Sequence, residues 1–162
     1  MEKKKRDVDY FEYYRKRGDF HKWKNIQHPI RLLKNFLMIT FCRLMPDNRF
    51  RYMIYRKLGA KIGKNVSMFG IRMDIFFPEL IEIGDNTLIG QDTMIITHEF
   101  LKSHWKRGRV KIGKNVTIGA MCLILPGVEI GDNVHVAAYS LVNKNVPEGK
   151  FVGGVPAKEI RR

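Results

Sequence analysis

The chain has 162 residues, of which 44% are hydrophobic, so it is long enough for a folded domain and too apolar for a disordered chain. Its formal net charge of +14 is concentrated near the N-terminus, because residues 1–61 hold 17 of the 30 Lys and Arg but 6 of the 16 Asp and Glu. A basic surface of this kind favours anionic partners such as membrane headgroups, nucleic acid or phosphorylated ligands.

The cysteines and the apolar runs indicate a cytoplasmic protein. Cys42 and Cys122 have neither a CxxC nor a metal-binding spacing, so we expect no disulfide framework. The segment 1–20 is basic but has no apolar stretch behind it, unlike a signal peptide. The most apolar run, residues 36–42, is too short to cross a bilayer.

Residues 1–59 form a basic N-terminal extension that we expect to be helical. Pro29 can begin a helix and Pro46 can end it. Between them, apolar residues recur at helical spacing at Ile30, Leu33, Leu37, Phe41 and Leu44. A second helix is predicted over about 48–58, whereas residues 1–27 have no firm periodicity.

From about residue 60 the hydrophobic period changes to six. The lead aliphatic residues are Ile112, Ile118, Ile124, Ile130, Val136 and Val142. Small or β-branched residues follow each of them by four positions: Val116, Cys122, Val128, Val134, Ser140 and Val146. A period of six fits neither an α-helix nor a simple alternating strand. It is typical of an all-β solenoid, in which each hexapeptide makes a short strand and a corner, three hexapeptides close one coil, and the lead residue points inward.

Two breaks in this register predict excursions from the coils. The step from Ile95 to Ile112 is not a multiple of six, so a loop is expected near 99–110. The step from Met68 to Ile83 is not a multiple of six either, so the segment 69–80 is expected to be irregular. Loops held by a rigid scaffold often carry function, and we expect the site there.

Three motifs make the chain similar to a known family: Thr97-His98, LPGVEIGD at residues 125–132 and GVPAK at residues 154–158. With them, residues 60–162 resemble the hexapeptide-repeat acetyltransferases, in particular the galactoside and maltose O-acetyltransferases and the capsule and colanic-acid polysaccharide O-acetyltransferases. The resemblance implies a left-handed parallel β-helix with a short N-terminal helical extension. It also implies a homotrimer with active sites between subunits, which moves an acetyl group from acetyl-CoA to a sugar hydroxyl in surface polysaccharide biosynthesis.

The resemblance assigns the catalytic role to His98. In this family a histidine removes the proton of the acceptor hydroxyl while the hydroxyl attacks the thioester. An alcohol is a weak nucleophile at neutral pH, where imidazole can act as a general base. Without the repeats, His98 would be interpreted as a surface histidine at the entrance of a loop; with them, catalysis is favoured.

The resemblance also assigns residues to the binding of CoA. Backbone groups near Gly119 and Ala138 would bond the amides of the pantetheine arm. The residues that would meet the phosphates at the adenosine end are Asn143, Lys144, Lys158 and Arg161. Asn143 replaces a Thr and Lys158 replaces an Arg of the sugar O-acetyltransferases, and such departures would alter affinity rather than the reaction.

The acceptor pocket is less well defined. Thr117 occupies the position of a Trp in the galactoside branch, which argues against a simple galactoside as substrate. The segments 69–80 and 99–110 would form the pocket, with Asp74 and Trp105 as candidate substrate-binding residues. Trp105 could equally anchor its loop on a neighbouring subunit.

Other hypotheses stay open at this point. The acceptor could be an antibiotic of the streptogramin type, or serine. The chain could also be a non-catalytic hexapeptide-repeat scaffold or a membrane-binding module. No metal is expected, because His98 and His104 have no third histidine at a matching position. Nucleic acid is not expected either, because no basic motif of a known reader occurs.

Residues 28–45 are apolar around most of the predicted helix. A helix of this kind does not lie free in water. It can cap the first coil, whose open strands would otherwise pair with other chains. Peripheral contact of residues 1–58 with the inner face of the membrane is a possible second role, because lysine and arginine are attracted to anionic lipids.

Overall fold

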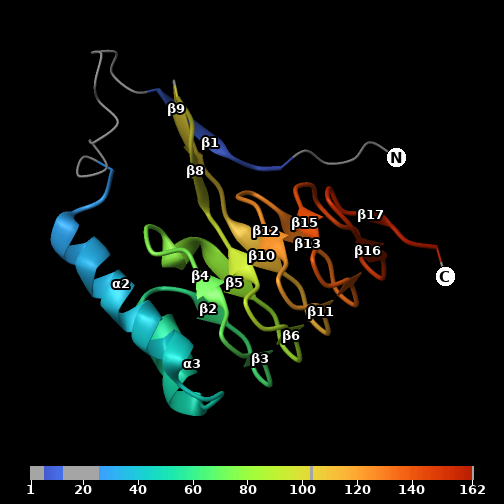
Figure 1. Ribbon diagram of the computed structural model, residues 1–162, viewed down its shortest axis with the longest axis horizontal. Helices are drawn as coiled ribbons and strands as arrows, with labels where there is room; N and C mark the ends of the chain where they lie inside the picture. Colours follow the sequence, from blue (N-terminus) through green and yellow to red (C-terminus); the bar gives the residue numbers. More distant parts are fainter. Residues whose placement is uncertain (1–5, 13–25, 103, 162) are drawn as a thin grey trace.

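The computed structural model describes residues 6–12, 26–102 and 104–161, so part of the extension 1–59 lies outside the described residues. Its main body is a three-sided prism of stacked coils (Figure 1). The first two coils consist of β2 (Lys61–Ile62), β3 (Ser67–Met68) and β4 (Arg72–Met73), then β5 (Ile81–Ile83), β6 (Leu88–Ile89) and β7 (Met94–Ile95). The next two consist of β10 (Val110–Ile112), β11 (Thr117–Ile118) and β12 (Leu123–Ile124), then β13 (Glu129–Ile130), β14 (His135–Val136) and β15 (Leu141–Val142).

Each face of the prism is a parallel sheet made of one strand from each coil. The orders are β13-β10-β5-β2, β14-β11-β6-β3 and β15-β12-β7-β4. After the last coil, β16 (Phe151–Gly153) adds to β14 in parallel, and β17 (Lys158–Glu159) pairs with β16 antiparallel. The six-residue period therefore produces the parallel solenoid that the sequence predicts.

The core is built from stacked inward-facing residues. The columns are Ile83, Ile112 and Ile130 on one face, Ile89, Ile118 and Val136 on the second, and Ile95, Ile124 and Val142 on the third. The six lead aliphatics predicted to point inward are all 3% exposed or less, which confirms the register.

One corner of the prism carries a ladder of asparagine side chains. Asn65, Asn86, Asn115 and Asn133 all have φ between 51° and 58°, a left-handed conformation that asparagine tolerates better than most residues. The Nδ2 atoms of the first three donate to the Oδ1 of the next asparagine at 3.2, 3.3 and 3.2 Å. The amides thus stabilise the tight corner and link consecutive coils.

Both register breaks contain ordered structure. Within residues 69–80, β4 pairs with β7, and a 3-10 turn, η2 (Pro78–Leu80), follows. The expected loop near 99–110 is a β-hairpin of β8 (His98–Phe100) and β9 (His104–Arg107) that projects from the prism (Figure 1). Its edge pairs with β1 (Asp9–Glu12), a strand that the sequence pattern of residues 1–27 did not predict.

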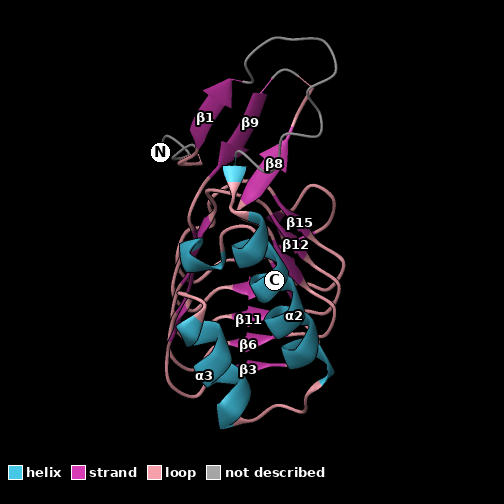
Figure 2. Cartoon of the chain, turned by 90° about the vertical axis from the view of Figure 1, so that its left-hand side faces the viewer, coloured by secondary structure: helices cyan, strands magenta, loops and turns pink. Residues whose placement is uncertain are grey.

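Two helices, α2 (Pro29–Leu44) and α3 (Arg49–Lys57), cover the end of the prism at the first coil (Figure 2). The turn between them is fixed by Arg51, which is 1% exposed and donates to Asp47 Oδ1 and to the carbonyl of Met45. The inner side of α2 carries Asn35, Ile39 and Cys42. The helical spacing noted above therefore marks the opposite, exposed side. No helix in the described part of the chain is long and apolar enough to cross a membrane.

Candidate active site

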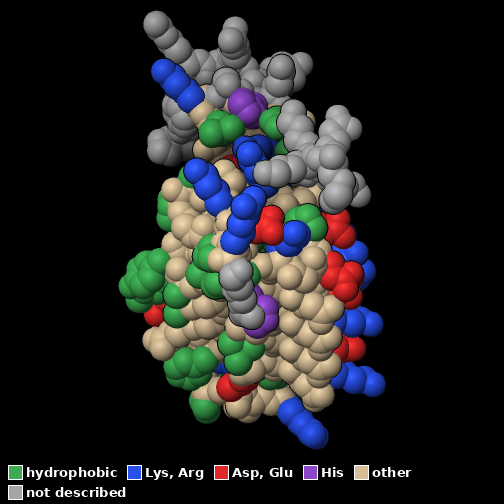
Figure 3. Space-filling view, turned by 90° about the vertical axis from the view of Figure 1, so that its right-hand side faces the viewer, with side chains coloured by type: hydrophobic (Ala, Val, Ile, Leu, Met, Phe, Trp, Pro, Cys, Tyr) green, Lys and Arg blue, Asp and Glu red, His purple; other side chains and the backbone are tan. Residues whose placement is uncertain are grey.

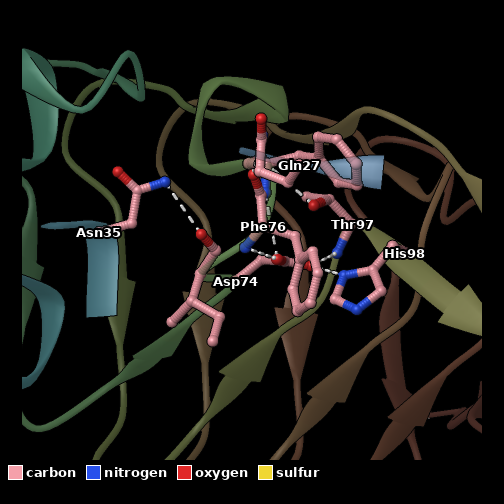
Figure 4. Close-up of polar contacts among 8 residues, drawn as sticks. Gln27, Asn35, Asp74, Phe76, Thr97 and His98 are labelled. Carbon is pink, nitrogen blue, oxygen red and sulfur yellow. Dashed lines mark hydrogen bonds and ion pairs between the residues drawn. The ribbon is translucent and has the colours of Figure 1, made fainter. Parts of the chain in front are cut away.

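His98 stands where the chain leaves the second coil, as the first residue of β8. Its side chain is 16% exposed, so part of the ring remains accessible. The Nδ1 atom lies 2.6 Å from Oδ2 of Asp74, which comes from the other excursion (Figure 4). A carboxylate can only accept, so Nδ1 carries a proton, and the form of the ring that can act as a base presents an unprotonated Nε2.

Asp74 is held in place by a complete set of donors. Its Oδ1 accepts from the backbone N–H groups of Phe76 and Phe77 at 2.7 and 3.2 Å, and its Oδ2 also accepts from the N–H of Thr97 at 2.7 Å. Burial raises the pKa of Asp74, but the hydrogen bond and charge of His98, together with Thr97, outweigh it and lower the pKa below its ordinary value. The carboxylate is therefore ionised at neutral pH and fixes the orientation of the imidazole.

The N-terminal extension holds the segment that presents Asp74. Asn35 of α2 donates to the carbonyl of Ile75 at 2.9 Å, and Gln27 donates to the carbonyl of Phe76 at 2.8 Å (Figure 4). On the other side, the Thr97 hydroxyl donates to the carbonyl of Phe77 at 3.2 Å. The N-terminal extension and the residue before His98 thus hold, from two sides, the segment that presents the Asp74 carboxylate.

An aromatic wall surrounds the imidazole. The ring centroids of Phe76 and Phe100 each lie 4.6 Å from that of His98, and the centroid of Phe77 lies 6.0 Å away. These rings limit the access of water to the base on their side. No spacing in the sequence marks these rings as part of a site, although the pair Phe76-Phe77 directly before Pro78 lies within a predicted excursion.

Trp105 supports this wall from behind. Its ring stacks on Phe77 with an interplanar angle of 6° and on Phe11 of β1 at a centroid distance of 4.2 Å, and the residue is 9% exposed. The guanidinium of Arg107 lies 5.0 Å from the Phe11 ring and 5.5 Å from the Phe77 ring. The tryptophan therefore packs the hairpin against β1 and the segment before η2, and its contact with a substrate stays a prediction.

The start of the described chain is fastened to the prism near the same place. The N–H of Asp7 donates to the carbonyl of Gly127 at 3.2 Å. Gly127 has φ of +73°, and a Cβ there would come 2.4 Å from the carbonyl oxygen of Asp7. Only glycine permits this close approach, so the LPGV corner serves as the attachment of the strand that flanks the hairpin.

Comparison with known proteins identifies the chain. Residues 109–144 match the family described as Bacterial transferase hexapeptide (six repeats). YvoF of Bacillus subtilis, named as a candidate acetyltransferase, is 45% identical over 133 residues that cover 81% of this chain and 77% of YvoF. This chain belongs to the hexapeptide-repeat acetyltransferases.

Two further relatives of this acetyltransferase extend the comparison. WbbJ of Escherichia coli, named as a candidate O-acetyl transferase of lipopolysaccharide biosynthesis, is 28% identical, with 82% of this chain and 93% of WbbJ covered. A galactoside acetyltransferase solved in complex with coenzyme A superposes with a TM-score of 0.66 at 23% identity, with 82% of this chain and 80% of that chain covered. The likeness of fold confirms the predicted left-handed parallel β-helix.

The residues of the acetyltransferase that the sequence assigned to the donor lie in two places. Gly119 and Ala138 touch across adjacent coils, because a Cβ on Gly119 would come 2.4 Å from the backbone nitrogen of Ala138. Asn143 and Lys144 follow β15, which lies two coils further along the same face as β7, the strand that precedes His98. Lys158 and Arg161 are exposed near the end of the chain, on or after β17.

Within one chain, these donor residues lie on other coils or another face than His98. The view onto the last coil shows hydrophobic side chains gathered along one side of the prism, whereas basic and acidic side chains alternate along the other (Figure 3). The exposed apolar residues of the later coils include Met121, Tyr139 and Val155. Among residues 6–12, 26–102 and 104–161, no three His, Cys, Asp or Glu side chains come together to hold a metal ion.

Proposed function

We propose that this acetyltransferase moves an acetyl group from acetyl-CoA to a hydroxyl of a sugar, in the biosynthesis of a surface polysaccharide. The observation that carries the proposal is the His98–Asp74 pair, in which a partly accessible imidazole is oriented by a buried, ionised carboxylate. The names of WbbJ and of the galactoside acetyltransferase support the sugar and the O-acetyl linkage. A non-catalytic scaffold would have no use for this pair.

The chemistry follows from the orientation of the ring. Nε2 of His98 accepts the proton of the acceptor hydroxyl while the oxygen attacks the thioester carbonyl. Asp74 stabilises the imidazolium that forms, as a carboxylate does behind a general-base histidine in other acyl-transfer sites. When the C–S bond breaks, the imidazolium returns the proton to the sulfur, which leaves an acetyl ester and free CoA thiol. The acetyl group goes directly from thioester to hydroxyl, so no enzyme nucleophile is needed.

The acceptor would lie against the aromatic wall. Phe76 and Phe100 flank the imidazole, and flat aromatic faces suit the apolar C–H face of a sugar ring. Asp74 would not touch this acceptor, because its oxygens are already taken by Phe76, Phe77, Thr97 and His98. We therefore propose Asp74 as a positioning residue rather than a substrate ligand.

The donor would lie along the later coils. Small residues at Gly119 and Ala138 allow an extended arm to approach the backbone, and Lys144, Lys158 and Arg161 supply positive charge for phosphates. Asn143 and Lys144 stand two coils from His98, which corresponds to roughly 10 Å at the spacing of hydrogen-bonded strands.

The separation of these residues favours a site completed by a second copy of the chain. Gly119 and Ala138 follow strands of one face, whereas His98 and Lys144 follow strands of the next face. We propose a homotrimer with three equivalent sites at subunit contacts. The side of the prism with exposed apolar residues, seen in Figure 3, would provide the contact. Light scattering of the purified protein tests this state, and a monomer that transfers acetyl groups would exclude it.

Acetyl-CoA as donor favours the cytoplasm as the compartment. The reaction is tested by incubating the full chain with acetyl-CoA and a panel of nucleotide-linked and lipid-linked sugars while free thiol is measured. We expect thiol release that depends on a sugar and is lost in His98→Ala. His28→Ala is the matched control, because the side chain of His28 is exposed at the start of α2 and makes no capping hydrogen bond to the helix. Equal turnover of both variants would exclude the assigned base.

A further inference from the structure

The outer surface of the two-helix cap has a composition unusual for a surface that faces water. On α2 the residues opposite the buried Asn35, Ile39 and Cys42 are apolar rather than polar. The exposed apolar residues of this surface, which we call the outer cap face, are Ile30, Leu33, Phe36, Leu37, Phe41 and Leu44 on α2 and Phe50 and Met53 on α3. Leu44 is 82% exposed and Ile30 is 72% exposed.

This face is not needed for the packing of the cap. The inner side of α2 already contacts the segment before η2 through Asn35, η2 through the ion pair of Arg31 with Glu79, and the second coil through the ion pair of Arg43 with Asp92. A helix that is apolar on the side away from its own chain requires another partner. Since the capping role is fulfilled by one side, the outer cap face is free for a second role.

The charge around the outer cap face is positive. Residues 28–58 contain seven Lys and Arg and a single acidic residue, Asp47, which is paired with the buried Arg51. The exposed basic residues are Lys34, Arg49, Arg56 and Lys57, together with Arg31 and Arg43, whose charges are balanced by their ion pairs with Glu79 and Asp92. An apolar helix face edged by Lys and Arg matches an anionic lipid surface, in which acyl chains lie beneath negative headgroups. Two copies of the face packed on each other would instead bring their basic edges together.

We propose that the outer cap face docks on an anionic lipid bilayer, with α2 lying in the plane of the interface. The 16 residues of α2 give a length of about 24 Å, and no helix of the described chain is suited to cross a bilayer, so the contact is peripheral. Both helices lie over the end of the prism, as Figure 2 shows, so docking leaves the hairpin and His98 in water. In a cyclic trimer all three faces lie at the same height along the symmetry axis, so they could bind one membrane together.

The test is vesicle flotation of the full-length protein at low and high salt. Vesicles of phosphatidylglycerol and phosphatidylcholine in equal amounts are compared with vesicles of phosphatidylcholine alone. We expect binding to the anionic vesicles that weakens at high salt, because the headgroup attraction is screened. A full-length protein that ignores anionic vesicles at low salt would overturn the proposal.

Matched variants locate the contact. Leu37→Ser, in the middle of the outer cap face, is expected to lower the vesicle partition coefficient by about tenfold, as loss of one buried leucine should. Leu88→Ser is the control, because Leu88 is 48% exposed on β6 and not on the cap. We expect Leu88→Ser to bind vesicles like the unmodified chain. Lys34→Ala combined with Arg49→Ala should lower anionic binding by roughly tenfold at low salt and less at high salt.

A second copy of the chain is the competing occupant, and light scattering distinguishes it. If Leu37→Ser reduces the oligomer mass while vesicle binding is unchanged, the face belongs to a subunit contact and the proposal is wrong. Acetyl-CoA binding by Leu37→Ser, measured by calorimetry, is expected to match the unmodified chain. This measurement separates membrane docking from the proposed acetyl transfer, since either can fail without the other.

Discussion

The third and fourth coils and the neighbourhood of His98 are built in different ways. Between Val110 and Val142, every structural position returns after three hexapeptides, so each strand is defined by its own hexapeptide and the hexapeptide beneath it. The Asp74–His98 pair joins residues 24 apart, and Asn35 supports it from a further 40 residues away. The coils thus depend on local rules, whereas the site depends on contacts among excursions that no period relates.

The largest effect is expected when the base is removed. His98→Ala should lower turnover by about 10²–10⁴-fold, because proton abstraction then falls to water. Acetyl-CoA binding should persist, since the base acts in the transition state. Steady-state kinetics with the best acceptor of the panel, together with calorimetric titration of acetyl-CoA, measures both quantities. If the site and the coils are independent in this way, the midpoint of thermal unfolding of His98→Ala should hardly differ from that of the unmodified chain.

A core substitution should have the opposite profile. Ile118→Ala removes a fully buried side chain between Ile89 and Val136, and it should lower the free energy of unfolding by about 2–5 kcal/mol. Urea denaturation measures the loss, and Ile118→Val serves as the milder companion. Turnover of the folded fraction should stay near that of the unmodified chain. A selective loss of turnover without loss of stability would contradict the division between coils and site.

Asp74→Asn should lower both the turnover and the free energy of unfolding moderately. The amide can donate to Nδ1 of His98, which would move the ring proton to Nε2 and block the base, so we expect turnover to fall by roughly 10²-fold. His98→Ala on this background should add little, because the two residues act as a unit. If the two losses of turnover instead add in the double variant, Asp74 and His98 do not act as a pair.

The lowered pKa of Asp74 predicts how its contribution to stability depends on pH. A carboxyl whose pKa is lower in the folded than in the unfolded chain stabilises the fold above its ordinary value of 3.8. The stabilisation is lost as the pH falls through the folded value. The difference in unfolding free energy between the unmodified chain and Asp74→Asn should be constant above about pH 5 and shrink below it. An increase of that difference on acidification would mean that the carboxyl is not ionised in the folded chain.

The smallest effects are expected at the proposed phosphate contacts. Lys144→Ala and Lys158→Ala should each raise the dissociation constant of acetyl-CoA by about threefold to tenfold and leave turnover at saturation unchanged, because exposed lysines act as screened point charges. Lys111→Ala is the control, since Lys111 pairs with Glu129 on another face. If all three variants bind acetyl-CoA equally well, Lys144 and Lys158 do not belong to the donor site.

The sequence predicted the coils, and the assignment of His98 as the base stays a prediction, whereas the surroundings of His98 were not predicted. The lead residues from Ile112 to Val142 are visible in the pattern because each obeys the same local constraint. His98 could be assigned only through a family motif. The contacts of Phe76, Phe100 and Phe11 depend on how two excursions and an N-terminal strand meet, which no spacing encodes. The helical pattern of α2 predicted the helix but not which side would face the coils, because polar Asn35 packs inward by donating to a backbone carbonyl.

The asparagine ladder has a consequence for how such an enzyme can change. Its rungs follow one another at sequence separations of 21, 29 and 18 residues, yet the amide spacing stays at 3.2–3.3 Å. Extra residues are therefore accommodated away from this corner, and the neighbouring coils do not shift. A lineage could lengthen, shorten or exchange the hairpin after β7 without refolding the prism. New acceptors would then be acquired by grafting a loop, while the donor slot stays as it is.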